Sequence, residues 1–203
     1  MKIRLFTRTL LLTFCLFLSS FTNAATSNLQ APQLVIENTS RALQEKLKTP
    51  AFAKNKTEVR NFVDKEIFPH IDTVRMSALA LGKHWRKASK EQKIQFIAAF
   101  KNLLINTYSA TFSEQFQNWS IEYLPLSIAA NDKSVTVKTT VHQSGKPNAK
   151  IDYSMVLRND KWFIYDLKVE GISLIISNRD TFNQMMKDND SLDAVIAKLE
   201  EKN

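Results

Sequence analysis

The sequence lacks the residues on which several protein chemistries depend. Its 203 residues include one cysteine, three glycines and three histidines. One cysteine cannot form an intramolecular disulfide, and no His/Cys cluster has the ligand spacing of a structural zinc site. Three glycines argue against P-loop and Rossmann folds, whose phosphate-binding turns depend on glycine. Folds built on disulfides, on zinc or on glycine-rich nucleotide-binding turns are therefore set aside.

The composition is that of one globular domain. Hydrophobic residues make up 44% of the chain and charged residues 24%, with a formal net charge of +8. This hydrophobic content is enough for a packed core and too high for a disordered chain. Because the basic residues are scattered and form no long run, we expect a solvated surface of mixed sign.

The N-terminus has the pattern of a secretory signal peptide. Three basic residues precede an apolar run at residues 10–18, and the small residues Thr22 and Ala24 follow. The run is too short to span a bilayer comfortably, and the small residues suit signal peptidase. We expect residues 1–24 to be cleaved near Ala24, which leaves one cysteine-free domain at 25–203 with a net charge of +5. Export also argues against nucleic acid as a partner.

Apolar residues follow a helical period over residues 32–118. Pro32 can begin a first helix, a second helix covers about 57–69, and a third follows Asp72 as its N-cap and ends at Gly82. These helices are short. We expect them to pack on a larger element.

The larger element is a long helix that begins at a capping box. Ser89 and Gln92 have the S-x-x-Q spacing in which each side chain binds the backbone N–H of the other residue. From Ile94 to Tyr108 apolar residues recur every three or four positions, in a stripe wide enough to face two neighbouring elements.

From Trp119 the apolar period changes to two. Strands are predicted at about 119–126, 134–141, 151–158 and 162–169, with turn residues between them. The last of these strands is apolar on both faces, so we expect both faces to be covered.

The sequence therefore predicts the α+β fold class. Residues 32–118 are helical, residues 119–170 form strands, and residues 171–202 form two C-terminal helices. The predicted architecture is a curled four-stranded antiparallel sheet packed against a long helix and several shorter helices.

Candidate catalytic residues are few. The three histidines lie far apart in the sequence, so neither a metal site nor a catalytic triad is supported. Ser173 lacks the second glycine of a nucleophile elbow and is better placed to cap a helix. Asp166 shares the parity of Trp162 and Ile164, so it could be an inward general base or could hold a backbone amide, a lysine or an arginine. The structural role is favoured, since no second titratable group can be placed beside it.

Aromatic residues are more numerous than one helix–sheet interface requires. The chain has 13 Phe, 4 Tyr and 3 Trp residues. Two explanations remain open: a well-filled core, which these features alone favour, or an apolar cavity for a lipid-like ligand between the helices and the sheet.

Two motifs resemble the MlaC, or toluene-tolerance, family of periplasmic phospholipid carriers. The first is LALGKHWRKASKEQ at 79–92, followed by apolar positions through Tyr108. The second is WFIYDL at 162–167, leading into VEGISLI at 169–175. They stand in the right order behind a signal peptide, and the resemblance covers essentially the whole mature chain.

The resemblance implies a function that the residues alone do not give. It implies a curled sheet, NTF2-like in appearance, that encloses an apolar cavity, and a non-enzymatic periplasmic shuttle that binds phospholipid and needs no cofactor. The implied partners are an outer-membrane lipoprotein associated with porin and the MCE-domain ring of an inner-membrane ABC transporter. The implied role is to maintain the lipid asymmetry of the outer membrane, with the carrier acting as a monomer.

On this hypothesis apolar side chains from the helices and the sheet surround the phospholipid tails, and Ile172 and Leu174 line the mouth of the cavity. The predicted lipid-binding residues are Leu81, Phe96, Phe100, Leu104, Tyr108, Val135, Val137, Ile151, Tyr153, Met155, Trp162, Ile164, Ile172 and Leu174.

Three points stay open. If the parity of the last strand is reversed, Phe163, Tyr165 and Leu167 replace Trp162 and Ile164 in the lining. An enzyme on a similar scaffold with Asp166 as the base is the chief alternative function. An envelope adaptor with a filled core that binds only partner proteins is the other.

Overall fold

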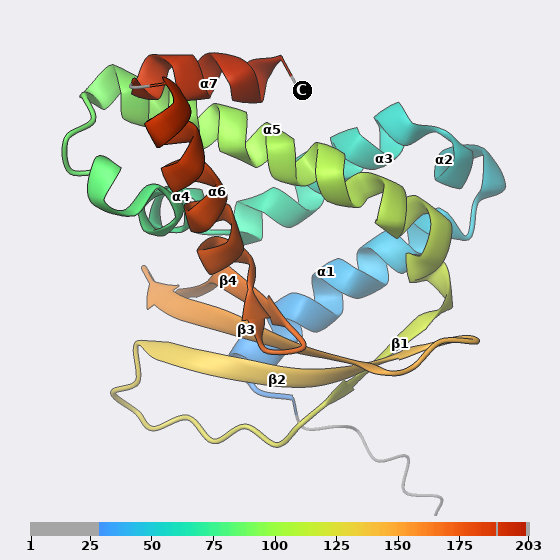
Figure 1. The fold of residues 1–203 in the computed structure, drawn as a ribbon. Helices are drawn as coiled ribbons and strands as arrows, with labels where there is room; N and C mark the ends of the chain where they lie inside the picture. The colour runs from blue at the N-terminus through green and yellow to red at the C-terminus, as the bar shows by residue number, and fades with distance from the viewer. Residues whose placement is uncertain (1–28, 190, 202–203) are drawn as a thin grey trace, which may run out of the picture.

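The computed structural model describes residues 29–189 and 191–201 and shows an α+β domain (Figure 1). The predicted signal peptide, 1–24, lies outside the described residues. The first part of the chain is helical: α1 (Ala31–Leu47), α2 (Pro50–Lys54), α3 (Lys56–Phe62), α4 (Thr73–Leu81) and α5 (Lys90–Gln115). The strands and the last helices follow: β1 (Trp119–Tyr123), β2 (Ser134–Gln143), β3 (Ala149–Arg158), β4 (Lys161–Val169), β5 (Ile172–Ser173), α6 (Leu174–Asn189) and α7 (Leu192–Glu200).

The local signals for helix ends are confirmed. Asp72 accepts a hydrogen bond from the Arg75 backbone N–H at 3.0 Å and caps α4. Gly82 follows α4 with φ +58°, a conformation that glycine adopts without a Cβ clash. Ser89 Oγ accepts from the Gln92 N–H at 3.1 Å, and Gln92 Oε1 accepts from the Ser89 N–H at 3.0 Å, which completes the capping box before α5.

The predicted continuous helix over 57–69 is wrong in part. The α-helix ends at Phe62 and continues as a π-helical turn, Val63–Ile67, and a 3₁₀ turn, Phe68–His70. Pro69 has no N–H to donate, so an α-helix cannot keep its hydrogen-bond ladder through this segment.

The sheet has five antiparallel strands in the order β1-β2-β3-β4-β5, and not the four that the sequence predicts. The additional strand β5 has two residues and pairs with the end of β4, Val169 facing Ile172. Two residues are too few to show an alternation of apolar and polar side chains in the sequence. The strand β5 is recognised only by its pairing with β4. The turn between β3 and β4 has positive φ at both Asn159 and Asp160, as a two-residue hairpin requires.

A bulge in β4 changes the face on which its second half lies. Ile164 pairs with Met155, but Asp166 pairs with the preceding residue, Ser154, so Tyr165 is an extra residue on β4. Asp166 therefore does not share the face of Ile164, and the parity prediction for it was wrong. Leu167 joins the face of Ile164 instead, because it pairs with Tyr153.

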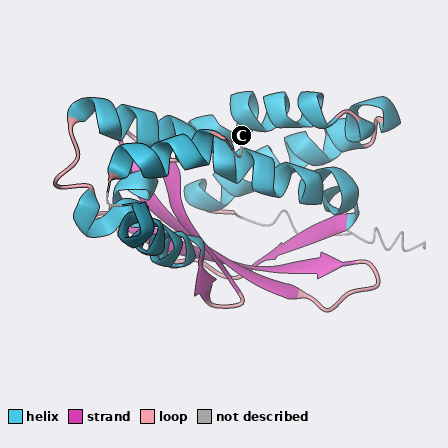
Figure 2. Cartoon of the chain, turned by 45° about the horizontal axis from the view of Figure 1, so that its top comes forward, coloured by secondary structure: helices cyan, strands magenta, loops and turns pink. Residues whose placement is uncertain are grey.

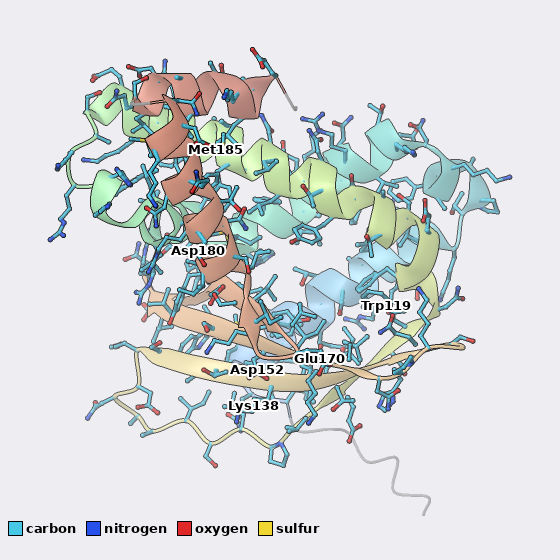
Figure 3. The ribbon with its side chains drawn as sticks, viewed as in Figure 1. Trp119, Lys138, Asp152, Glu170, Asp180 and Met185 are labelled. Atoms are coloured by element: carbon cyan, nitrogen blue, oxygen red, sulfur yellow. The ribbon has the colours of Figure 1, made fainter. Side chains whose placement is uncertain are left out.

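Helices and sheet form two layers, and the sheet is curled (Figure 2). Helix α1 crosses the inner face of the sheet, and α5 lies on the other side of α1 (Figure 1). On the outer face, Lys138 of β2 pairs with Asp152 of β3, away from the helical layer (Figure 3). The apolar interior thus lies between the sheet and the helices, and one face of α1 packs against it.

Candidate functional site

The interior is divided into two separate apolar clusters. The helical cluster gathers buried side chains from the helices, among them Leu43, Leu81, Phe96, Phe100, Leu104, Phe182 and Val195. The sheet cluster consists of Ile36, Val137, Met155, Trp162 and Ile164, with partly buried neighbours around them. Helix α1 contributes to both clusters, through Ile36 to the sheet cluster and through Leu43 to the helical cluster.

One row of side chains on the inner face of the sheet lies between the two clusters. Strand register aligns five residues across all five strands: Tyr123, Thr139, Ile151, Val169 and Ile172. On one side of the row Ile121 packs against the helical cluster, and on the other side Val137 belongs to the sheet cluster.

Helix α1 presents a polar residue opposite this row. Ile36, Ser40 and Leu43 follow one another at helical spacing, and Ser40 stands between a residue of the sheet cluster and a residue of the helical cluster. Ser40 and the five residues of the row are called the seam below. Its centre contains hydroxyl groups, unlike the clusters on either side.

The hydroxyl groups of the seam lie close together. Tyr123 is near Glu37, Ser40 and Tyr153, and the Thr139 hydroxyl donates to the Ile151 carbonyl at 2.9 Å. Ser40 and the Glu37 carboxylate are the side chains within hydrogen-bonding reach of the Tyr123 hydroxyl.

Burial changes the acidity of the two tyrosines. It raises the pKa of Tyr153 to about 12, against a smaller opposing effect of hydrogen bonding with Thr139. It also raises the pKa of Tyr123 above its usual range, and the nearby Glu37 carboxylate raises that pKa further. Both phenols are therefore protonated, and able to donate hydrogen bonds, at any physiological pH.

The seam reaches the protein surface at its β4–β5 end. Val169 is 49% exposed and Ile172 is 67% exposed, and Ile176 in the first turns of α6 is 48% exposed. Three large aliphatic side chains so close in sequence and so exposed are uncommon in a fully filled core. This end of the seam is an exposed apolar patch.

The fourteen predicted lining residues do not form one wall. Phe96, Phe100, Leu81 and Leu104 are buried in the helical cluster, and Leu174 packs against it. The sheet cluster contains Val137, Met155, Trp162 and Ile164, with Val135 and Tyr153 packed against it. Ile151 and Ile172 lie in the seam, and Tyr108 is 37% exposed on α5.

Sequence reasoning missed the polar members of the seam. The predicted lining residues do not include Ser40, Tyr123 or Thr139. Ser40 and Thr139 are polar, and Tyr123 lies on the irregular first strand, where the apolar period is weak. A signal existed for Ser40, which interrupts an otherwise apolar stripe on α1 at the position between Ile36 and Leu43.

Asp166 and Ser173 have structural roles. Asp166 accepts from the Ser173 hydroxyl at 2.7 Å and from the Ile175 N–H at 3.2 Å. Ser173 Oγ in turn accepts from the Ile176 N–H at 3.1 Å and caps α6, as predicted. Both carboxylate oxygens of Asp166 are engaged at the start of a helix, on the face of β4 opposite Ile164.

Other kinds of site find little support in the part of the chain that the structure describes. No group of three or more His, Cys, Asp or Glu side chains there could hold a metal ion. None of the helices in 29–189 and 191–201 combines the length and apolar character of a membrane span. A surface hollow of about 410 Å³, lined in part by Leu47, Lys54 and Glu114, shares no residue with the seam.

The curled sheet, the helical layer on its inner face and the divided interior define a small α+β domain with a candidate ligand site between its layers. A phospholipid-binding protein from Ralstonia solanacearum, solved in complex with a phospholipid, has a similar structure. The two chains are 26% identical, with a TM-score of 0.77, and the match covers 85% of this chain and 96% of the other.

The family follows from the sequence match. The family model described as "MlaC protein" matches residues 37–201, which include all the helices and strands named above except the start of α1. The chain belongs to the MlaC family.

Proposed function

We propose that this protein binds a phospholipid between its helices and its sheet and carries it through water. The observation that supports this most strongly is the divided interior, in which a seam separates two apolar clusters and ends at the exposed apolar side chains of Val169 and Ile172. The structural similarity to a protein that holds a phospholipid supports the choice of ligand.

The physical need for such a carrier follows from the hydrophobic effect. Each methylene group moved from water into an apolar site contributes about 0.8 kcal/mol. The two acyl chains of a phospholipid therefore cannot cross water unshielded at a useful rate. Apolar surfaces on both sides of the seam offset that cost, while a headgroup outside the protein keeps its own hydration.

The proposal includes a place and partners. The carrier works in the periplasm after cleavage near Ala24, and it moves phospholipid between an outer-membrane lipoprotein associated with porin and the MCE-domain ring of an inner-membrane ABC transporter. In this role it maintains the lipid asymmetry of the outer membrane and acts as a monomer without a cofactor. The basis is membership of the MlaC family and the signal-peptide pattern of the sequence.

The proposal assigns no catalytic step to the chain. Asp166, the candidate base of the alternative enzyme, holds Ser173 and the N–H of Ile175 at the start of α6. A carboxylate whose two oxygens accept hydrogen bonds from Ser173 of β5 and Ile175 of α6 anchors the start of that helix.

A pair of neighbouring substitutions on β3 tests the binding site. Ile151 is a partly buried member of the seam, and Lys150 is exposed on the opposite face of the same strand. Ile151→Glu places a charge between the two clusters and should abolish phospholipid co-purification, because a buried carboxylate cannot coexist with acyl chains. Lys150→Glu introduces the same residue outside the seam and should retain the lipid.

The measurement is lipid extraction and mass spectrometry of each variant, with far-ultraviolet circular dichroism to confirm folding. A folded Ile151→Glu variant that keeps its phospholipid would contradict the placement of the ligand in the seam. Wild-type protein that never carries lipid would favour the envelope adaptor instead.

A further inference from the structure

The turn between β4 and β5 has an unusual residue. Val169 and Ile172 pair across a two-residue turn, in which φ is +50° at Glu170 and +82° at Gly171. Turns of this kind favour Asn, Asp or Gly at the first central position, because most other residues are strained at positive φ. Glutamate is therefore strained at position 170, and its contacts must offset that strain.

The side chain of Glu170 takes the place of a backbone acceptor. The Glu170 N–H donates to the Lys150 carbonyl at 2.9 Å, so the pairing of β4 with β3 continues to this residue. In a regular antiparallel pair the Lys150 N–H would donate back to the Glu170 carbonyl. Here it donates to Oε1 of the Glu170 carboxylate, at 2.6 Å. Because hydrogen bonds to a charged acceptor are the stronger kind, this carboxylate fastens the tip of the hairpin to β3.

The base of the hairpin is held by a different contact. Ser173 of β5 pairs with Lys168 of β4, and its hydroxyl donates to Asp166 at 2.7 Å. These contacts lie at the start of α6, whereas Glu170 lies in the turn. Loss of the Glu170 contact would therefore release the tip of the hairpin while its base stays anchored.

The tip of the hairpin carries the exposed end of the seam. Val169 and Ile172 are the last two residues of the row that crosses the sheet, and they are 49% and 67% exposed. Glu170 lies between them, where the chain leaves the sheet toward α6 (Figure 3). A change in the position of the tip would therefore move the apolar surface at this end of the seam.

We propose that Glu170 is a positioning residue, which holds the tip of the β4–β5 hairpin against β3 and thereby sets the rate at which phospholipid enters and leaves the seam. This proposal rests on the proposed function and adds a route and a rate to it. The strain at Glu170 offsets part of the strength of its hydrogen bond, so the contact can open reversibly. A contact made equally in the free and the loaded protein slows loading and release by the same factor and leaves the affinity unchanged.

Exchange kinetics test the proposal. Delipidated protein is mixed with a short-chain fluorescent phosphatidylethanolamine below its critical micelle concentration, and loaded protein is chased with the unlabelled lipid. Asn suits the left-handed conformation of the turn, but its side chain is one methylene shorter and does not reach the Lys150 N–H. Glu170→Asn should raise both rate constants by about 2- to 10-fold, the effect of one hydrogen bond, with an unchanged Kd.

Two matched variants separate the contact from the charge. Glu170→Gln keeps the length of the side chain and an acceptor oxygen, so both rates should stay within about 2-fold of the wild type. Asp160→Asn removes a carboxylate from the exposed turn between β3 and β4, where φ is +59°, and should have the rates of the wild type. Circular dichroism checks the fold of each variant.

Hydrogen exchange of the Lys150 amide measures the contact without lipid. This amide should be protected in the wild type and in Glu170→Gln, and it should exchange faster in Glu170→Asn. A Lys150 amide that exchanges at the unprotected rate in the folded wild type overturns the contact.

The outcomes separate this proposal from the carrier function. Unchanged rates in a folded Glu170→Asn variant overturn the role of Glu170 while the carrier function stands. Faster release with an unchanged loading rate also overturns that role, since Glu170 would then stabilise only the loaded protein. Equal acceleration by Asp160→Asn would assign the effect to charge and has the same consequence. A wild-type protein that takes up no lipid overturns both the carrier function and the role of Glu170.

Discussion

The carboxylate of Asp166 joins β4 to the start of α6. It accepts hydrogen bonds from the Ser173 hydroxyl and the Ile175 N–H, both in the first residues of the β5–α6 segment. Because Asp166 is 8% exposed, removing its carboxylate leaves buried donors without partners.

Asp166→Ala should therefore lower the free energy of unfolding by about 3 kcal/mol, the size expected for lost charge-assisted hydrogen bonds. Urea denaturation measures the change. Asp180→Ala, at an exposed position on the same helix, is the control and should change stability by less than about 0.5 kcal/mol. Similar values for the two variants would show that Asp166 does not anchor α6.

Ionisation of Tyr153 should lower the stability of the folded protein at high pH. Its pKa is about 12 in the folded protein because of burial, compared with 10.0 for the unperturbed group. A pKa raised on folding means that the neutral form is favoured in the folded state. Its stabilisation is complete below pH 10 and is lost as the pH rises toward 12.

Tyr153→Phe should therefore make the fall in melting temperature between pH 9.5 and 11.5 shallower than in the wild type. Tyr165→Phe, which removes a phenol that packs against Arg75, is the control for the loss of a tyrosine hydroxyl. Equal slopes for the wild type and Tyr153→Phe would show that Tyr153 ionises at its ordinary pKa.

Helix α6 is held to α5 by a cluster of three aromatic rings. Phe182 of α6 meets Phe96 and Phe100 of α5 edge to face, at centroid distances of 5.1 and 5.2 Å. All three side chains are almost fully buried. Such a cluster combines burial of large apolar area with the favoured ring geometry.

Phe182→Ala should lower the free energy of unfolding by about 3–5 kcal/mol, since it removes a buried ring and leaves a cavity. Ile176→Ala, at a 48% exposed position of the same helix, should have a much smaller effect. Chemical denaturation compares the two. A small loss for Phe182→Ala would mean that α5 and α6 close over the missing ring.

The helix ends show what the sequence alone could predict. Asp72, Gly82 and the Ser89/Gln92 capping box act within a few residues, so their spacing is enough to identify them. The bulge at Tyr165 and the strand β5 depend on pairing with other strands. The spacing of apolar residues within one segment cannot show such pairing. For this reason the sequence predicts four strands and places Asp166 on the wrong face of β4.

The candidate site also has a part that the sequence predicts and a part that it does not. Apolar period placed Ile151 and Tyr153 on the inner face of the sheet. The hydrophobic period of the sequence could not identify the polar centre of the seam. Ser40 and Tyr123 are 83 positions apart in the sequence, and they come together only because α1 crosses the sheet. A site formed by strand register and helix packing becomes visible only in the folded chain.

The interior of the whole molecule consists of two apolar clusters, one among the helices and one between α1 and the inner face of the sheet. Helix α1 contributes to both clusters, and the seam runs across its middle at Ser40. A bound phospholipid would add apolar contacts to both sides, and binding to the folded state alone would raise its stability.

Native mass spectrometry of the mature protein, purified from a cell envelope without detergent, tests directly whether the folded chain carries a phospholipid. We predict a species heavier than the polypeptide by the mass of bound phospholipid, which mild organic extraction removes while the circular dichroism spectrum is retained. A freshly prepared, folded protein at the mass of the polypeptide alone would contradict the carrier function.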